Sequence, residues 1–165
     1  MKKLLYFIAA LCLIACEGNS PKVTIEGEFV DLGLSSGTKW KTENEFNPAD
    51  SAYGFYRYAE AVRLFGSYLP TKQQWEELKN ECTFTIIDDS WTRITGPNGN
   101  SIMVRKMGYR GTDNKVCKED EGVGYYWTST YNSENNRAWF IEIGTWVTIM
   151  TYGGMDGLCV RLAKQ

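Results

Sequence analysis

The stretch GYYWTSTYNSENNRAWFIEIGTWVTIMTYGGMDGLCVR, residues 124–161, decides the fold. It holds three of the chain's six tryptophans, on aromatic and β-branched runs that Gly and Asn interrupt. Aromatic and β-branched residues favour strands, whereas Gly and Asn mark turns. The stretch therefore predicts a series of short antiparallel strands that carry both the core and the binding surface.

Alternation within these runs predicts which side chains are buried. One face of the run 138–143 carries Trp139, Ile141 and Ile143. We expect Trp139, with Trp127 in the preceding run, to belong to the core. In the closing run 158–162, Arg161 and Cys159 lie on the face opposite the aliphatic residues. We expect Arg161 to be half-buried and paired with a carboxylate.

The composition of the chain excludes several classes of function. The chain has 165 residues, a net charge of −2, 14% aromatic residues and no histidine. This length suits one domain once a leader is removed. The acidic balance argues against nucleic acid as a partner, because such binding needs a basic surface. The absence of histidine excludes His-based catalytic triads, His-ligated zinc and the usual general base at neutral pH.

The N-terminus has the pattern of a leader. Lys2 and Lys3 precede an apolar run at 4–15, too short to cross the roughly 30 Å core of a bilayer as a helix. The run ends in Leu-Ile-Ala-Cys at 13–16, which resembles the lipobox of bacterial lipoproteins. That resemblance implies a signal peptide at 1–15 and lipid attachment at Cys16. An ordinary secretory peptide is the alternative.

The remaining boundaries follow from these assignments. Residues 16–27 are polar and predict a tether, and residues 28–165 form the domain. The lipid chains would hold the protein on a membrane of the cell envelope, which we expect to be the outer membrane, on its surface or periplasmic face.

One helix is predicted after Pro70. Thr71 is a good N-cap, and Gln74 three residues later completes a capping box. Trp75, Leu78 and Cys82 then lie on one apolar stripe. The pattern predicts an amphipathic helix of about eleven residues that packs on a sheet.

The rest of the chain predicts strands and irregular segments. Strands are expected at 29–32, 39–42, 84–87, 91–95 and 101–104, the last two joined by a turn at 96–100. Residues 46–69 predict an irregular, aromatic-rich region with a helical turn at 58–64. Residues 112–122 predict a charged, solvated loop.

Five motifs in order resemble the FISUMP-type domain, named for the Fibrobacter succinogenes major paralogous proteins and abundant in Bacteroidetes lipoproteins. They are VDLGLSSGTKW (30–40), LPTKQQWEEL (69–78), TGPNGNSI (95–102), GYYWTST (124–130) and CVR (159–161). The resemblance implies an α+β domain with a C-type-lectin-like, formylglycine-generating-enzyme-like fold. Such a fold has mostly antiparallel sheet, one or two helices, long loops and neighbouring termini.

The cysteines depart from the family pattern. Family members often have a cysteine shortly after the opening tryptophan, where this chain has residues 41–44, and a serine where Cys159 stands. Cys82, Cys117 and Cys159 remain after Cys16, so at most one intramolecular disulfide forms. A Cys117–Cys159 bridge and no bridge at all are both open, and Cys82 is expected to be a small buried hydrophobe.

Catalysis and metal binding are not expected. The related oxidases use a close-spaced pair of cysteines that binds copper, whereas Cys117 and Cys159 are far apart in sequence. The acidic-Pro-Asn and Trp-Asn-Asp motifs of calcium-dependent lectins are absent. We therefore expect no catalytic residue, no metal and no other cofactor.

Ligand binding is the remaining function. Exposed aromatic rings stack on sugars or fill partner pockets, while Asn and Arg side chains supply hydrogen bonds. In related variable proteins, recognition maps to the C-terminal face. The candidate residues are Tyr131, Asn132, Asn135, Arg137, Trp146 and Tyr152. The expected ligand is a glycan or a protein; the alternatives are a structural role in a surface assembly or a formylglycine-generating-type thiol oxidase.

Overall fold

The computed structural model describes residues 25–118, 121–151 and 153–165, which fold as an α+β domain. Their elements are β1 (Phe29–Asp31), β2 (Lys39–Glu45), α1 (Tyr58–Phe65), the 3₁₀ helix η1 (Gly66–Tyr68), α2 (Lys72–Glu81), β3 (Thr83–Ile86), β4 (Trp91–Thr95), β5 (Ser101–Arg105), β6 (Tyr109–Gly111), β7 (Val116–Cys117), β8 (Gly124–Asn132), β9 (Arg137–Ile143), β10 (Val147–Met150), β11 (Met155–Gly157) and β12 (Val160–Lys164). The strands expected from the sequence are confirmed to within a few residues. The expected loop at 112–122 contains the short strand β7.

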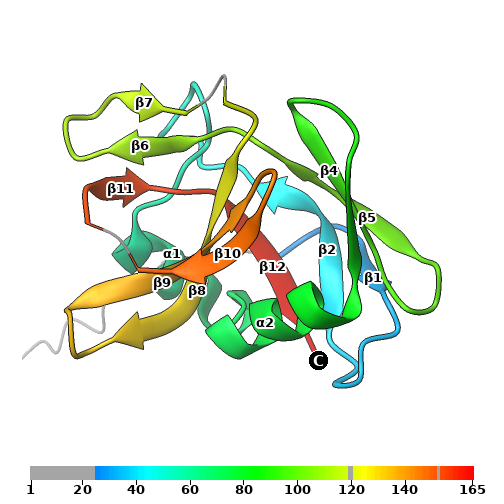
Figure 1. The fold of residues 1–165 in the computed structure, drawn as a ribbon. Coiled ribbons are helices and arrows are strands. Elements are labelled where there is room, and N and C mark those ends of the chain that lie inside the picture. Colours follow the sequence, from blue (N-terminus) through cyan, green and yellow to red (C-terminus); the bar gives the residue numbers. More distant parts are fainter. Residues whose placement is uncertain (1–24, 119–120, 152) are drawn as a thin grey trace, which may run out of the picture.

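The strands form small antiparallel sheets rather than one large sheet (Figure 1). Their strand orders are β1-β2-β12, β3-β4-β5, β10-β9-β8 and β11-β6-β7. Because β1 and β12 both pair with β2, the two ends of the domain lie in one sheet. The prediction of an α+β, mostly antiparallel domain is confirmed.

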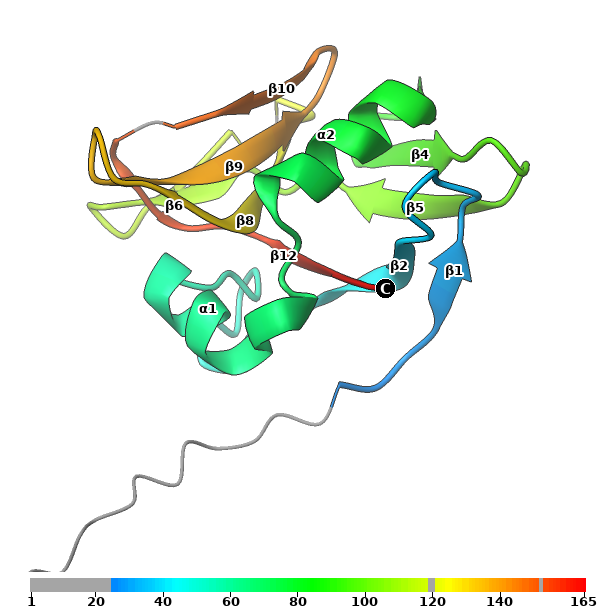
Figure 2. The same ribbon diagram turned by 90° about the horizontal axis from the view of Figure 1, so that it is seen from below.

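Helix α2 joins two of these sheets. It lies between the β8–β9–β10 sheet and the β3–β4–β5 sheet in both ribbon views (Figures 1 and 2). The capping box predicted at its start is present: the Thr71 side chain accepts a hydrogen bond from the Gln74 amide, and the Gln74 side chain accepts one from the Thr71 amide. The fully buried Trp75 packs against the rings of Trp40 on β2 and Tyr126 on β8, with ring centres 4.5 and 5.8 Å away.

Removing the cap tests how much this helix start contributes. We expect Thr71→Ala to lower the free energy of unfolding by about 1 kcal/mol, because the Gln74 amide loses its acceptor. Urea unfolding followed by circular dichroism measures the change. Ser133→Ala, in an exposed turn, is the control and should leave the midpoint in place. Equal midpoints for Thr71→Ala and the unchanged protein would contradict the prediction.

The region 46–69 is more ordered than its sequence predicts. The helical turn expected at 58–64 is confirmed as α1, whose buried Ala61 and Phe65 face the core. Phe65 meets Tyr56 edge-on, with ring centres 5.1 Å apart. Gly66 ends the helix at a φ of +50°, a conformation that glycine adopts without strain.

Strand β9 is buried on both faces, so alternation misplaces part of the core. Phe140 is as fully buried as Ile141 and Ile143, which point the opposite way. Trp139 is only half-buried, and the Lys72 ammonium lies 4.6 Å from its ring centre. The expectation that Trp139 belongs to the core was therefore only partly right, because its side chain is half-buried rather than fully buried. Trp127 is buried as expected, and its ring N–H donates to the Tyr56 carbonyl at 2.7 Å.

Within the described residues, no helix has the length and apolar character that crossing a bilayer requires. The leader and Cys16 lie outside those residues, so the predicted lipid attachment remains a prediction.

Candidate functional site: an arginine-lined cavity

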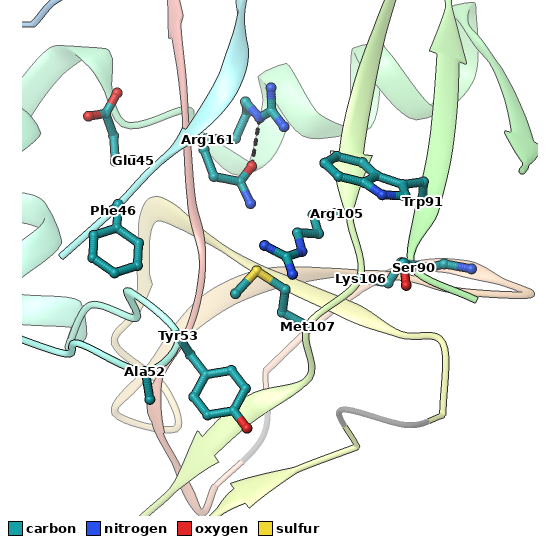
Figure 3. Close-up of a pocket in the computed structure, with 11 residues that line it drawn as sticks. Glu45, Phe46, Ala52, Tyr53, Ser90, Trp91, Arg105, Lys106, Met107 and Arg161 are labelled. Carbon is teal, nitrogen blue, oxygen red and sulfur yellow. Dashed lines mark hydrogen bonds between the residues drawn. The ribbon is translucent and has the colours of Figure 1, made fainter. Parts of the chain in front are cut away.

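A cavity of about 420 Å³ opens beside the sheet that joins the two ends of the domain (Figure 3). The end of β2, the following loop, the start of β4, the end of β5 and Arg161 of β12 contribute to it. The lining residues are Asn44, Glu45, Phe46, Ala52, Tyr53, Ser90, Trp91, Arg105, Lys106, Met107 and Arg161. The volume falls within the range of small-ligand sites.

Arg161 forms the buried back of this cavity. The side chain is 1% exposed, and within the described residues the hydrogen-bond acceptors of its guanidinium are uncharged. It donates from Nε to Asn44 Oδ1 at 3.0 Å, and from its two terminal nitrogens to the carbonyls of Lys41 and Met103 at 2.7 Å each. The expectation of a half-buried Arg161 paired with a carboxylate was wrong. Neutral oxygens from β2 and β5 surround it instead.

Tyr126 extends this polar network toward β5. Its hydroxyl accepts from Asn44 Nδ2 at 3.2 Å and donates to the Arg105 carbonyl. Burial raises the pKa of Tyr126 above its ordinary value, so the hydroxyl stays protonated and remains a donor. The network therefore fixes the positions of β2, β5, β8 and β12 around the cavity. We call the side chains of Arg161, Asn44 and Tyr126, with the carbonyl groups that accept their hydrogen bonds, the Arg161 network.

Arg105 differs from Arg161 because it is exposed. Its guanidinium carbon lies 5.9 Å from the centre of the Trp91 ring, and its side chain extends into the cavity (Figure 3). Within the described part of the chain, this guanidinium has no ion pair or hydrogen bond. The five N–H donors of Arg105 are thus available to a ligand.

Aromatic and apolar side chains form the remaining walls. Phe46 is 58% exposed, and Trp91 also presents part of its ring to solvent. Gly54 lies under the Phe46 ring with a φ of +69°, and a Cβ at this glycine would lie 2.3 Å from a ring atom. This close approach holds the ring at the cavity edge. The site therefore combines open ring faces with an unpaired cation.

The residues predicted for ligand binding do not line this cavity, nor do they meet at one place. Tyr131, Asn132, Asn135 and Arg137 gather at the turn between β8 and β9. Asn135 donates to Thr151 Oγ1 at 2.8 Å, and Tyr131 donates to Asn136 Oδ1 at 2.7 Å.

Trp146 lies at the other end of β9, in the turn that leads to β10, where it is 78% exposed. The length of β9 therefore separates Trp146 from the β8–β9 turn. Tyr152 lies outside the described residues.

Sequence reasoning missed Arg105 and Trp91 because neither belongs to the C-terminal strands. The signal that was available is Arg161, a charged residue inside a closing strand that is otherwise apolar. A buried arginine requires several acceptors. These acceptors come from β2 and β5, which also form the cavity, but no local pattern in the sequence identifies those strands as the partners of Arg161.

The thiols have the properties of structural cysteines. Cys82, Cys117 and Cys159 are all free, so the Cys117–Cys159 bridge left open by the sequence is not formed. Burial raises the pKa of the Cys159 thiol to about 12, and burial with nearby Glu81 and Glu77 raises that of Cys82 to about 11. Both thiols are neutral at pH 7, whereas nucleophilic and metal-binding cysteines are thiolates.

Alkylation of the folded protein tests this difference. With iodoacetamide at pH 8, we expect Cys117 to react at least tenfold faster than Cys159, because Cys159 is buried and protonated. Peptide mass spectrometry over a time course measures the rates. Labelling in urea is the control, in which the two rates should converge. Fast labelling of Cys159 in the folded protein would contradict its burial.

One further cluster of polar residues is internally paired, and the described residues offer no metal site. In a second cavity, the Arg110 guanidinium donates to both Asp50 carboxylate oxygens, at 2.6 and 2.7 Å. Burial raises the pKa of Asp50, but the guanidinium and the amides of Tyr53 and Phe55 outweigh it, so the pKa lies below its ordinary value. The described residues contain no group of three or more Cys, Asp or Glu side chains placed to hold a metal ion.

Comparison of the whole chain with protein-family models, with curated proteins and with solved structures found no match.

Proposed function

We propose that this protein is a lipid-anchored protein of the bacterial cell envelope whose domain binds a glycan or protein ligand and catalyses no reaction. The observation that carries the proposal is the cavity held by the Arg161 network, with open aromatic faces and an arginine, Arg105, that has no ion pair or hydrogen-bonded partner for its guanidinium within the described residues. Binding sites combine apolar walls with a few fixed polar groups in this way. The raised pKa values of Cys82 and Cys159 disfavour the thiol-oxidase alternative.

The fold part of the proposal is a C-type-lectin-like domain of the FISUMP type. The pairing of β1 and β12 with the same strand supports it, because neighbouring termini are an expectation of that fold. Small antiparallel sheets with two short helices also agree with it.

The anchoring part rests on the lipobox-like residues 13–16. Metabolic labelling of producing cells with an alkyne fatty acid tests it. Label incorporation that Cys16→Ser abolishes supports acylation, with Cys12→Ser as the matched control. Release of an unlabelled protein into the soluble fraction would support the ordinary secretory peptide instead.

A glycan-array screen of the full-length protein, kept in detergent, tests the binding part. We expect reproducible binding that survives EDTA, because the cavity offers no metal ligand set within the described residues. Binding that falls with Trp91→Ala would place the ligand at the cavity. A blank array from protein shown to be folded would contradict glycan binding and move the test to proteins of the envelope.

One observation favours a second function, as a structural subunit of a surface assembly. Trp146 is the most exposed of the large apolar side chains in the described residues and sits on a tight turn. Exposed tryptophans are frequent anchors of protein contacts. Light scattering of the full-length protein should then show an oligomer that Trp146→Ala dissociates; a monomer would exclude self-assembly.

A further inference from the structure

We propose that the cavity of Figure 3 recognises a sugar that bears a carboxylate, and that Arg105 is the residue that contacts the carboxylate. This inference rests on the proposed ligand-binding function and specifies its ligand class. Three features of the cavity support it: the Arg105 guanidinium, which has no ion pair or hydrogen bond within the described residues; the charges around the cavity; and the exposed aromatic rings of its walls.

The position of Arg105 suits direct contact with an anion. It is the last residue of β5, and its backbone carbonyl is held by the Tyr126 hydroxyl. Its side chain points into the cavity, and its guanidinium carbon lies 5.9 Å from the centre of the Trp91 ring (Figure 3). A guanidinium presents a planar fork of donors that matches the two oxygens of a carboxylate. Because that fork is unoccupied within the described residues, a ligand carboxylate would displace only water.

The charge balance favours an anion over a cation. Among the described residues, Glu45 is the one acidic side chain that lines the cavity, and Lys41 forms an ion pair with it. Arg161 adds a buried positive charge whose hydrogen-bond partners are neutral. A charge removed from water is screened weakly, so the field of Arg161 extends into the cavity. Lys106, which is 6% exposed, also lines the cavity, so with Glu45 paired, the described residues Arg105, Lys106 and Arg161 leave the cavity positive.

The cavity walls favour a sugar over a bare inorganic anion. Phe46 and Trp91 lie on different sides of the cavity, and both leave ring surface open (Figure 3). A phosphate or sulfate ion would leave these rings in contact with water. A pyranose ring stacks its C–H face on an aromatic ring, and a carboxylate attached to that ring reaches the guanidinium. An acidic sugar thus uses the rings and the cation together.

The other cavities lack this combination. The cavity at Asp50 has its strongest cation, Arg110, already bound to two carboxylate oxygens and to the Asn114 carbonyl. In the cavity between the loop before β2, η1, α2 and the C-terminus, the Glu77 carboxylate accepts from the amide and hydroxyl of Ser36. Neither offers an unpaired guanidinium beside an open ring.

Titration of the full-length protein with a glucuronic-acid disaccharide tests the inference, followed by calorimetry or tryptophan fluorescence. The methyl ester of the same disaccharide removes the charge and keeps the ring. We expect the ester to bind at least tenfold more weakly. We expect Arg105→Gln to weaken binding of the acid by about ten- to hundredfold, because the substitution removes a hydrogen bond to a charged group. The same substitution should leave binding of the ester unchanged.

Arg93→Gln is the matched control. Arg93 is an exposed arginine on neighbouring β4 that does not line the cavity. It should leave the affinity for the acid within about twofold. Equal losses for Arg93→Gln and Arg105→Gln would reduce the effect to general surface charge and overturn the inference. Arg105→Lys, which keeps the charge without the fork, should bind the acid with intermediate affinity.

The remaining outcomes separate this inference from the proposed function. Equal binding of acid and ester, or array binding confined to neutral glycans, would overturn the acidic-sugar inference and leave ligand binding intact. A peptide with a free C-terminal carboxylate could also bind more tightly than both its C-terminal amide and the disaccharide. That result would overturn the choice of a sugar as the ligand. No binding to any glycan or envelope protein would overturn the proposed function itself.

Discussion

Arg161→Met is expected to lower the free energy of unfolding by about 3 kcal/mol. The substitution keeps much of the side-chain length but removes every donor to Asn44 and to the carbonyls of Lys41 and Met103. Each buried acceptor left unsatisfied costs about 1–3 kcal/mol. Relief of the buried positive charge offsets part of that sum, because an uncompensated guanidinium is costly to bury. We expect the lost hydrogen bonds to dominate, since three acceptors lose their donor.

Thermal and urea unfolding measure the effect, which corresponds to a fall of roughly 6–12 °C in Tm for a domain of this size. Arg105→Met is the matched control: the same change at an exposed arginine whose side chain makes no hydrogen bond to a described residue should shift stability by less than about 0.5 kcal/mol. An Arg161→Met protein as stable as the unchanged one would mean that its acceptors find water or other donors, and the network would not be structural.

Arg161 and Arg105 have different roles at the site. Arg161 ties β12 to β2 and β5 through hydrogen bonds that are complete without a ligand. Arg105 gains its position from the same network through its carbonyl, while its guanidinium lies beside the Trp91 ring and has no hydrogen bond or ion pair within the described residues. Loss of Arg161 should therefore weaken folding and ligand binding together. Loss of Arg105 should affect ligand binding alone, and this contrast separates a positioning residue from a contacting one.

Elements defined by local sequence could be predicted well. The capping box at Thr71 and the stripe of Trp75 and Leu78 require only residues within one or two helical turns, and α2 forms as they predict. The strands around residues 91–105 follow from a turn cluster between two alternating runs. In these segments, the nearest neighbours in sequence supply most of the interactions that fix the structure.

Features that depend on distant contacts could not be predicted. The partners of Arg161 come from residues about 60 and 120 positions away along the chain, and no local pattern identifies them. Strand β9 is covered on both faces, so its alternation carries no information about which side is the core. The cavity assembles Phe46, Trp91 and Arg105 from three segments, and it exists only after those segments pack.

Trp75→Ala is expected to cost about 3–5 kcal/mol of unfolding free energy, the largest effect among the substitutions considered. Trp75 is fully buried on α2 and contacts Trp40 and Tyr126, which belong to two different sheets. Its ring N–H also donates to the Trp127 carbonyl at 3.4 Å. Truncation therefore leaves a cavity between the sheets and removes the main contact through which α2 holds them together.

Urea unfolding followed by circular dichroism measures this loss, with Trp146→Ala as the matched control. The same truncation at the exposed Trp146 should change stability by less than about 0.5 kcal/mol. Trp75→Phe, which keeps an aromatic ring but loses volume and the N–H donor, should fall between the two. If Trp75→Ala and Trp146→Ala unfolded at the same urea concentration, α2 would contribute little to the core. Since Tyr126 packs on Trp75 and also joins the Arg161 network, we expect Trp75→Ala to loosen the cavity as well, and to weaken ligand binding although Trp75 does not line it.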